Sequence, residues 1–240
     1  MAHCPTEHAK AYPFDIPGQS YVLDGADWRP LNGAPVLPGR HAVIASGSNA
    51  SPERLAAKYA DYDDLLDDSI FVMRAKLYDF DTVYSAHIAS YGAIPATLAQ
   101  SRGAVAEVFI TWLTDTQLER MHETEAVGVN YDFVKLSGIH LLCETGTGLT
   151  AAHAYISKRG CLSKDGQPVP LAATNAIGRQ SRAMSQAEAL DYARSLIAPQ
   201  EDPDAFIRQH IDCTATRAER TRRLAQDALK LDWPGVVVVK

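Results

Sequence analysis

Two short segments of this 240-residue chain contain residue types that could carry chemistry. The first is Gly47-Ser48-Asn49, which lies between an apolar run, 42–45, and a helix-start signature, 51–55. A strand that turns at a glycine into a helix presents free backbone N–H groups at the positive end of the helix dipole, where a carboxylate or phosphate can bind. The segment therefore predicts an anion site, and a plain structural turn is the alternative.

The second segment runs from Thr114 to Val134. Thr114 and Gln117 form a capping-box pattern, which predicts that a short helix begins here. Glu125 falls on the same side of that helix as Met121, so its carboxylate is predicted to point inward. An inward carboxylate is costly unless it is paired or protonated, and it could act as an acid/base group near neutral pH. In the alternative interpretation, Glu125 lies one residue past the helix end and simply caps or pairs.

The elements that would position these residues are strands in the centre of the chain. Strand patterns occur at 71–78, 83–88, 104–113, 133–143 and 151–156. About six strands with few helices between them predict an α+β fold with a small mixed β-barrel, not a doubly wound sheet. Residues 41–170 are predicted to form this domain, with flanking helices.

The two ends of the chain differ from this centre. Residues 1–40 are rich in proline and glycine and lack periodicity, so we expect an N-terminal extension that wraps the core or stays partly mobile. Residues 171–240 are predicted to form a helical C-terminal extension packed on the barrel, with helix starts at Ser185, Pro203 and Thr216. In the last helix one apolar stripe is expected, formed by Leu224, Ala225, Ala228 and Leu231.

That last helix also carries a group of arginines: Arg217, Arg220, Arg222 and Arg223. They could bind an anionic partner. On an acidic protein, the preferred interpretation is that they form the solvated face of a docked helix.

Four motifs occur in a particular order: Ser46-Gly47-Ser48-Asn49, Pro95-Ala96-Thr97-Leu98, the strand 105–109, and the stretch 121–126 followed by Tyr131. In order and spacing they resemble the gamma-glutamyl cyclotransferase family, including its gamma-glutamylamine cyclotransferase branch and the AIG2-like proteins. The resemblance covers roughly residues 41 to 157 and implies a lyase or acyltransferase on a small mixed β-barrel.

The resemblance implies intramolecular aminolysis of a gamma-glutamyl amide, a small-molecule substrate. Its alpha-carboxylate would bind at the loop of Ser46, Gly47, Ser48 and Asn49, and Glu125 would move the proton from the alpha-ammonium to the departing amine. The products would be 5-oxoproline and a free amine or amino acid. Tyr131 would hydrogen-bond near the substrate or merely pack. No cofactor is called for.

Three positions depart from the family pattern. Ser46 replaces a tyrosine, Glu107 replaces a strand glycine, and Ala126 replaces the glycine after the catalytic glutamate. Glu107 would either enter the pocket as a selectivity element or lie on the solvent face of its strand. These departures leave two alternatives open: a non-catalytic binding or regulatory protein of the same fold, and an amide hydrolase.

Composition limits the classes of partner. The net charge of −6 argues against nucleic acid or an acidic membrane surface as a partner. The chain has no long apolar run and no signal peptide pattern, and its four cysteines form no Cys-x-x-Cys pair. We therefore expect reduced thiols and a cytoplasmic protein. The eight histidines show no ligand spacing, so no metal site is predicted. A homo-oligomer is left open.

Overall fold

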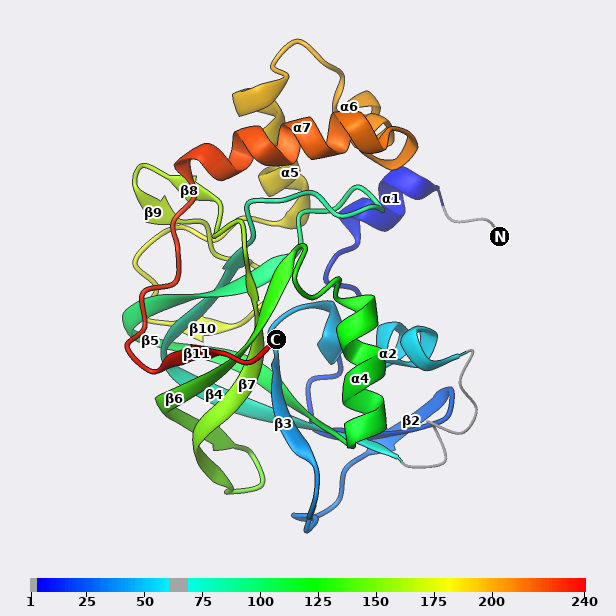
Figure 1. Ribbon diagram of the computed structural model, residues 1–240, viewed down its shortest axis with the longest axis vertical. Helices are drawn as coiled ribbons and strands as arrows, with labels where there is room; N and C mark the ends of the chain where they lie inside the picture. The colour runs from blue at the N-terminus through cyan, green and yellow to red at the C-terminus, as the bar shows by residue number, and fades with distance from the viewer. Residues whose placement is uncertain (1–3, 61–68) are drawn as a thin grey trace.

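The computed structural model describes residues 4–60 and 69–240, and its centre is a closed ring of five strands (Figure 1). The strands are β3 (His41–Ala45), β4 (Ile70–Tyr84), β5 (Ala96–Leu113), β6 (Tyr131–Cys143) and β7 (Gly148–Ser157). They pair in the order β5-β3-β7-β6-β4, and β4 pairs with β5 to close the ring. Only the β3–β7 pair in this ring is parallel. The predicted α+β fold with a small mixed barrel is confirmed.

Two of these strands are longer than the sequence patterns predicted. β4 runs without a break from Ile70 to Tyr84, so the separate strand predicted at 83–88 is wrong. β5 likewise joins the segments 96–98 and 104–113 into one strand. The β4–β5 register shifts next to Asp79, which has a φ of 61°, and Gly103 has a φ of 80°. Such an irregularity lets a long strand bend around a barrel.

The five strands alternate residues between two cores. Ile44 on β3 belongs to a buried cluster that draws residues from all five strands, including Leu77 and Leu136, so this cluster fills the barrel. Its neighbours Val43 and Ala45 belong to a second cluster that includes residues of two helices. These helices are α2 (Pro52–Tyr59) and α4 (Asp115–Thr124), which lie together beside the barrel in Figure 1.

The N-terminal forty residues contribute regular structure. The elements are α1 (Pro5–Lys10), β1 (Tyr21–Asp24) and β2 (Asp27–Pro30). Strand β1 pairs with β4, and Tyr21 and Leu23 are fully buried. Strands β1 and β2 are each only four residues long, too short for a periodic pattern of apolar residues to be recognised.

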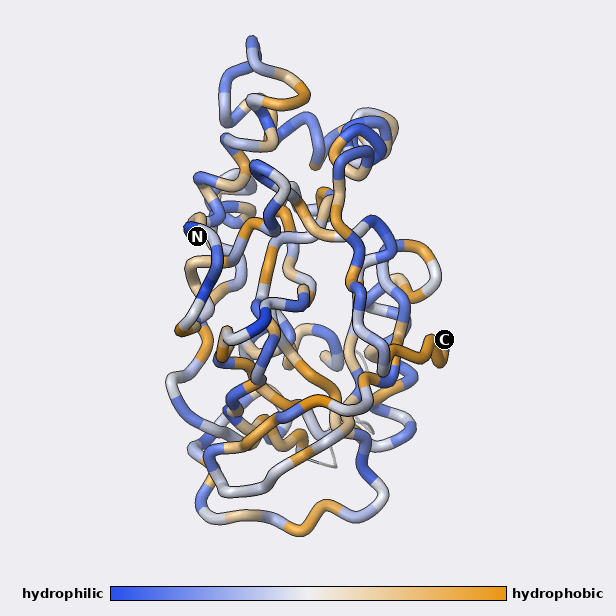
Figure 2. The backbone as a smooth tube through the Cα atoms, turned by 90° about the vertical axis from the view of Figure 1, so that its left-hand side faces the viewer, coloured by the Kyte–Doolittle hydropathy of each residue, from blue (hydrophilic) through white to orange (hydrophobic). Residues whose placement is uncertain are grey.

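Short strands complete the sheets. They are β8 (Ser163–Lys164), β9 (Gln167–Pro168), β10 (Ala176–Ile177) and β11 (Val236–Val238). The pair β8–β9 forms a small separate sheet, whereas β10 adds to β5 and β11 adds to β6. The hydrophobic C-terminal end is visible in Figure 2. All four cysteines are free.

Three helices lie across one end of the barrel (Figure 1). They are α5 (Gln186–Ile197), α6 (Pro203–Asp212) and α7 (Thr214–Leu224). The predicted start at Thr216 is wrong, since α7 begins two residues earlier. It ends at Leu224 and continues as the 3-10 turn η2 (Ala225–Asp227), so Ala228 and Leu231 lie outside the helix and form no stripe on it. No helix in the described part of the chain is long and apolar enough to cross a membrane.

Candidate functional site

A cavity of about 540 Å³ lies between the barrel and α7. Its wall includes every residue that the sequence singled out for the site: Ser46, Gly47, Ser48, Asn49, Glu125 and Tyr131. The two segments, some seventy-five residues apart in the sequence, therefore meet at one cavity, whose volume falls within the range of small-molecule sites.

Glu125 is the first residue after α4 and caps its C-terminus. This is the position that the alternative interpretation gave it, yet its side chain turns inward and is only 15% exposed. Its Oε1 atom forms an ion pair with Lys58, whose side chain is also 15% exposed, and accepts a hydrogen bond from Asn49 Nδ2 at 3.1 Å. Its Oε2 atom has no hydrogen-bond partner among the described residues. One carboxylate oxygen is thus held while the other is left for a ligand.

The chain after Glu125 turns sharply. Ala126 has a φ of 49°, and Gly128 has a φ of 82°. The helix itself ends at Thr124. The left-handed conformation at Ala126 reverses the chain directly after Glu125, whose own backbone stays in the helical region.

The loop that follows β3 contains the 3-10 turn η1 (Ser48–Ala50). The N–H of Ala50 donates to Gly47 O at 2.9 Å, and the N–H of Ser51 donates to Ser48 O at 3.0 Å. Ser51 occupies the N-cap position of α2 without a side-chain capping bond. Part of the predicted set of free main-chain donors is therefore used within the loop itself.

Tyr12, from the N-terminal segment, lies against this loop. Its hydroxyl oxygen accepts hydrogen bonds from Ala96 N, at 2.7 Å, and from the Ser48 N–H. A Cβ atom at position 47 would collide with that hydroxyl, so glycine is required there. Burial raises the pKa of Tyr12 well above its usual value, so the phenol keeps its proton. Ser46 provides no tyrosine, but a tyrosine reaches the loop from another part of the chain.

Tyr131 at the start of β6 donates its hydroxyl to Ala96 O at 3.0 Å. Burial, followed by the neighbouring Tyr12, raises the pKa of Tyr131 well above its usual value. Its ring packs edge-on against His87, with ring centroids 5.3 Å apart. Because its hydroxyl binds the main chain, Tyr131 serves the cavity as a packed wall.

His87 lines the cavity, is buried, and contacts a serine hydroxyl through its ring nitrogen Nδ1. Its Nδ1 atom lies 2.6 Å from Ser85 Oγ, which donates to Ser157 Oγ at 2.7 Å. Since Ser85 gives its proton to Ser157, His87 donates through Nδ1 and keeps a lone pair on Nε2. Burial, followed by the charge of Arg159, lowers the pKa of His87 to about 3, so the imidazole is neutral.

Glu107 does not line the cavity. It forms an ion pair with Arg74, and its side chain is 22% exposed. The interpretation of Glu107 as a selectivity element is therefore wrong, and the solvent-face alternative is the one that the structure supports.

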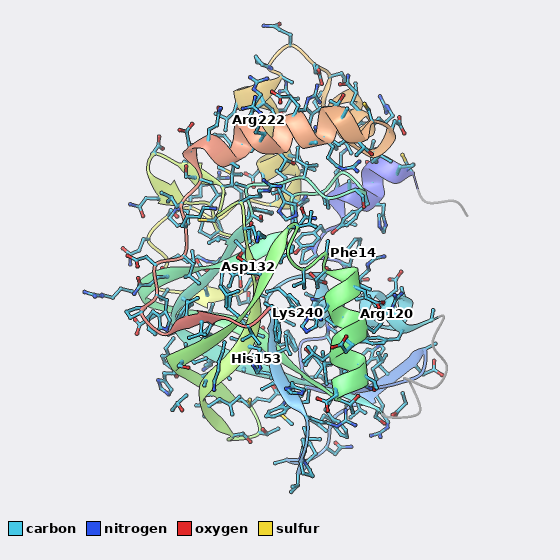
Figure 3. All side chains as sticks on the ribbon, in the orientation of Figure 1. Phe14, Arg120, Asp132, His153, Arg222 and Lys240 are labelled. Carbon is cyan, nitrogen blue, oxygen red and sulfur yellow. The ribbon has the colours of Figure 1, made fainter. Side chains whose placement is uncertain are left out.

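The cavity wall also contains cationic side chains that sequence reasoning did not assign to the site: Arg54, Lys58, Arg159, Arg217 and Arg222. Arg54 lies over the ring of Phe14, 4.7 Å from its centroid. Figure 3 shows Phe14 beside the upper end of α4, and it shows Arg222 on α7, above the barrel.

The interpretation of the α7 arginines as a solvated face is correct for Arg222 and Arg223, which are exposed, but wrong for Arg220, which is buried. Arg220 is 8% exposed and bonds to Glu201 and Gln209. Arg223 donates to Ile197 O at 2.8 Å. The positions of these arginines around the helix did not predict such hydrogen bonds, because the acceptors come from α6 and α5, on a side of α7 that was expected to face solvent.

No protein-family model and no curated protein matches the chain. Among solved structures, an uncharacterized protein from Homo sapiens is similar at 13% identity, with 84% of this chain and 95% of that one covered and a TM-score of 0.42. A gamma-glutamyl cyclotransferase is similar at 15% identity, with 83% and 94% covered and a TM-score of 0.40. A protein from Arabidopsis thaliana is similar at 17% identity, with 53% and 66% covered and a TM-score of 0.36. At these scores the function has to be argued from the chain's own residues.

Proposed function

We propose that this protein converts a gamma-glutamyl amide into 5-oxoproline and a free amine by intramolecular aminolysis. The observation that carries the proposal is the state of Glu125. Its carboxylate is fixed through Oε1 by Lys58 and Asn49, and its Oε2 is without a partner among the described residues, at the wall of a cavity that also includes the loop at 46–49. A fixed carboxylate with one open oxygen suits proton transfer to and from a bound ligand.

The substrate would bind with its alpha-carboxylate toward the loop at 46–49. The loop uses part of its own N–H groups, so the guanidinium of Arg54 on α2 is the cation that complements the carboxylate at this end of the cavity. The alpha-amine of the glutamyl group then lies on the side of Glu125.

The chemistry needs no water and no second substrate. Glu125 accepts a proton from the alpha-ammonium, and the free amine attacks the gamma-carbonyl carbon of the same molecule. The new C–N bond closes a five-membered ring, and the proton on Glu125 passes to the departing nitrogen as the old C–N bond breaks. The second proton of the ring nitrogen then follows through the freed carboxylate, so the amine leaves as an ammonium ion. Since the nucleophile and the carbonyl belong to one molecule, holding the folded conformer supplies much of the acceleration.

Neutral groups line the rest of the reacting region. The raised pKa values of Tyr12 and Tyr131 keep both phenols protonated, and His87 is neutral because burial lowers its pKa to about 3. Glu125 is then the side chain at this end of the cavity that offers an open carboxylate oxygen while it keeps its pair with Lys58.

The experiment is an incubation of the purified protein with gamma-glutamyl amines, gamma-glutamyl dipeptides and glutathione, followed by detection of 5-oxoproline. We expect release from at least one class, and loss of turnover in Glu125→Gln by about a hundredfold or more. Glu119→Gln is the matched control, because Glu119 lies on the same helix with a side chain that is 75% exposed. Turnover in Glu125→Gln at the wild-type rate would remove Glu125 from the mechanism, and release of glutamate would make the protein a hydrolase.

A further inference from the structure

One face of α7 forms part of the cavity wall, and this face is polar. Thr214, Arg217, Ala218, Thr221 and Arg222 line the cavity. Their spacing places them on one side of the helix, because residues three, four and seven apart share a face. A helix that only covered a hydrophobic core would present apolar residues there.

This wall concentrates positive charge in a chain whose net charge is −6. Lys58 is compensated by Glu125, and Arg222 pairs with Glu219 in an exposed contact of 2.7 Å. An exposed pair of this kind is weak and leaves the guanidinium available to a ligand.

Two further arginines have no acidic partner in the part of the chain that the structure describes. Arg217 donates to His210 O and to Thr214 Oγ1, neither of which carries charge. The guanidinium of Arg159 has no hydrogen-bond or ion-pair partner among the described residues. Arg159 lines the cavity, and its positive charge helps to lower the pKa of the buried His87 ring.

We propose that Arg159, Arg217 and Arg222 form an anion subsite for the leaving group, so that the amine released by this protein carries an oxyacid group, a carboxylate or a phosphate. This inference rests on the proposed function. Both oxyacids offer the planar or forked oxygens that guanidinium groups bind in a bidentate manner, and the subsite lies at the α7 end of the cavity, away from α2 and Arg54.

The proposed contacts orient the substrate within the cavity. The glutamyl end lies at the loop and Glu125, and the departing amine extends toward α7. An uncharged amine would leave Arg159 and Arg217 facing the cavity without a counter-charge, whereas an anionic one compensates them. The subsite therefore favours gamma-glutamyl compounds whose other end is anionic over uncharged gamma-glutamyl amides.

The test compares three substrates that differ only in that end: gamma-glutamylglycine, gamma-glutamyl-aminomethylphosphonate and gamma-glutamyl-methylamide. The readout is kcat/KM for 5-oxoproline release. We expect wild type to prefer the anionic substrates by about tenfold or more, and Arg217→Gln to reduce that ratio by about tenfold, mainly through KM. The better of the two anionic substrates identifies the oxyacid. Arg208→Gln is the control, since Arg208 is 54% exposed and does not line the cavity.

Arg217 also bonds to the main chain of α6, so Arg159→Gln serves as a second variant whose side chain has no such structural bond. Turnover without any preference for the anionic substrates would overturn the subsite and leave the proposed function standing. If no substrate is turned over, calorimetric titration with gamma-glutamylglycine and gamma-glutamyl-methylamide tests whether the subsite binds an anionic group. If the anionic compound binds more tightly and Arg159→Gln removes that advantage, the subsite is supported although the proposed cyclisation is not. Equal binding of the two compounds would overturn the subsite as well.

Discussion

The ion pair between Lys58 and Glu125 can be tested through its contribution to stability. The perturbation is Lys58→Met, which keeps a similar side-chain length and removes the charge. The carboxylate of Glu125 would then keep only the hydrogen bond from Asn49 Nδ2. Because both side chains are 15% exposed, the pair lies between a surface pair and a fully buried one.

The expected magnitude follows from that burial. Surface ion pairs contribute about 0.2–1 kcal/mol, and removal of one partner of a buried pair costs about 3–5 kcal/mol. We therefore expect Lys58→Met to lower the free energy of unfolding by about 2 kcal/mol. For a chain of this size that loss corresponds to a fall in Tm of roughly 4–8 °C.

The assay is a double-mutant cycle measured by urea unfolding. If the two residues interact as described, Glu125→Gln should cost less in the Lys58→Met background than in wild type, with a coupling of about 1–2 kcal/mol. Additive effects of the two substitutions would contradict the inward position of Glu125.

Three other perturbations have defined outcomes. Ala126→Gly should be neutral or stabilising by up to about 1 kcal/mol, because Ala126 has a φ of 49°, and a loss in Tm would contradict this. Gly47→Ala should lower both Tm and turnover, because the new Cβ would collide with Tyr12, and wild-type behaviour would contradict the contact. Burial, aided by neighbouring arginines, lowers the pKa of His87 and of His210 to about 3. Unfolded histidine binds protons below about pH 6.5, whereas these two folded histidines do so only near pH 3, so the free energy of unfolding should be highest above pH 6.5 and fall as the pH is lowered toward 3. The expected loss at pH 5 is about 2 kcal/mol per histidine, and equal urea midpoints at pH 7 and pH 5 would contradict it.

The sequence was most informative where local chemistry decides the structure. The capping box at Thr114 begins α4 as predicted, and the pattern after Asn130 becomes β6. The inward direction of Glu125 was also predicted from its distance to Met121, although the residue lies one position past the helix. The prediction holds because the backbone of Glu125 keeps helical angles, so the four-residue spacing from Met121 still applies. The left-handed turn that follows at Ala126 is one that a non-glycine residue gives no reason to expect.

The residues that the sequence missed come from elements whose spatial position depends on long-range packing. Tyr12 precedes the barrel and reaches the loop because it packs in a cluster with residues of α5 and α6 and accepts a hydrogen bond from Ala96 N. Arg217 reaches the cavity because α7 lies across the barrel end, and no local pattern specifies where a helix docks. Lys58 could have been found from the sequence, because it lies four residues after Arg54 on the helix that follows the loop, and residues four apart share one face of a helix.

The most direct test of the proposed chemistry is the oxygen content of the product formed in water labelled with heavy oxygen. Attack by the internal amine adds no oxygen from solvent, so 5-oxoproline from a gamma-glutamyl amide should carry none of the label. Labelled glutamate, formed by attack of water on the gamma-carbonyl, would contradict the account.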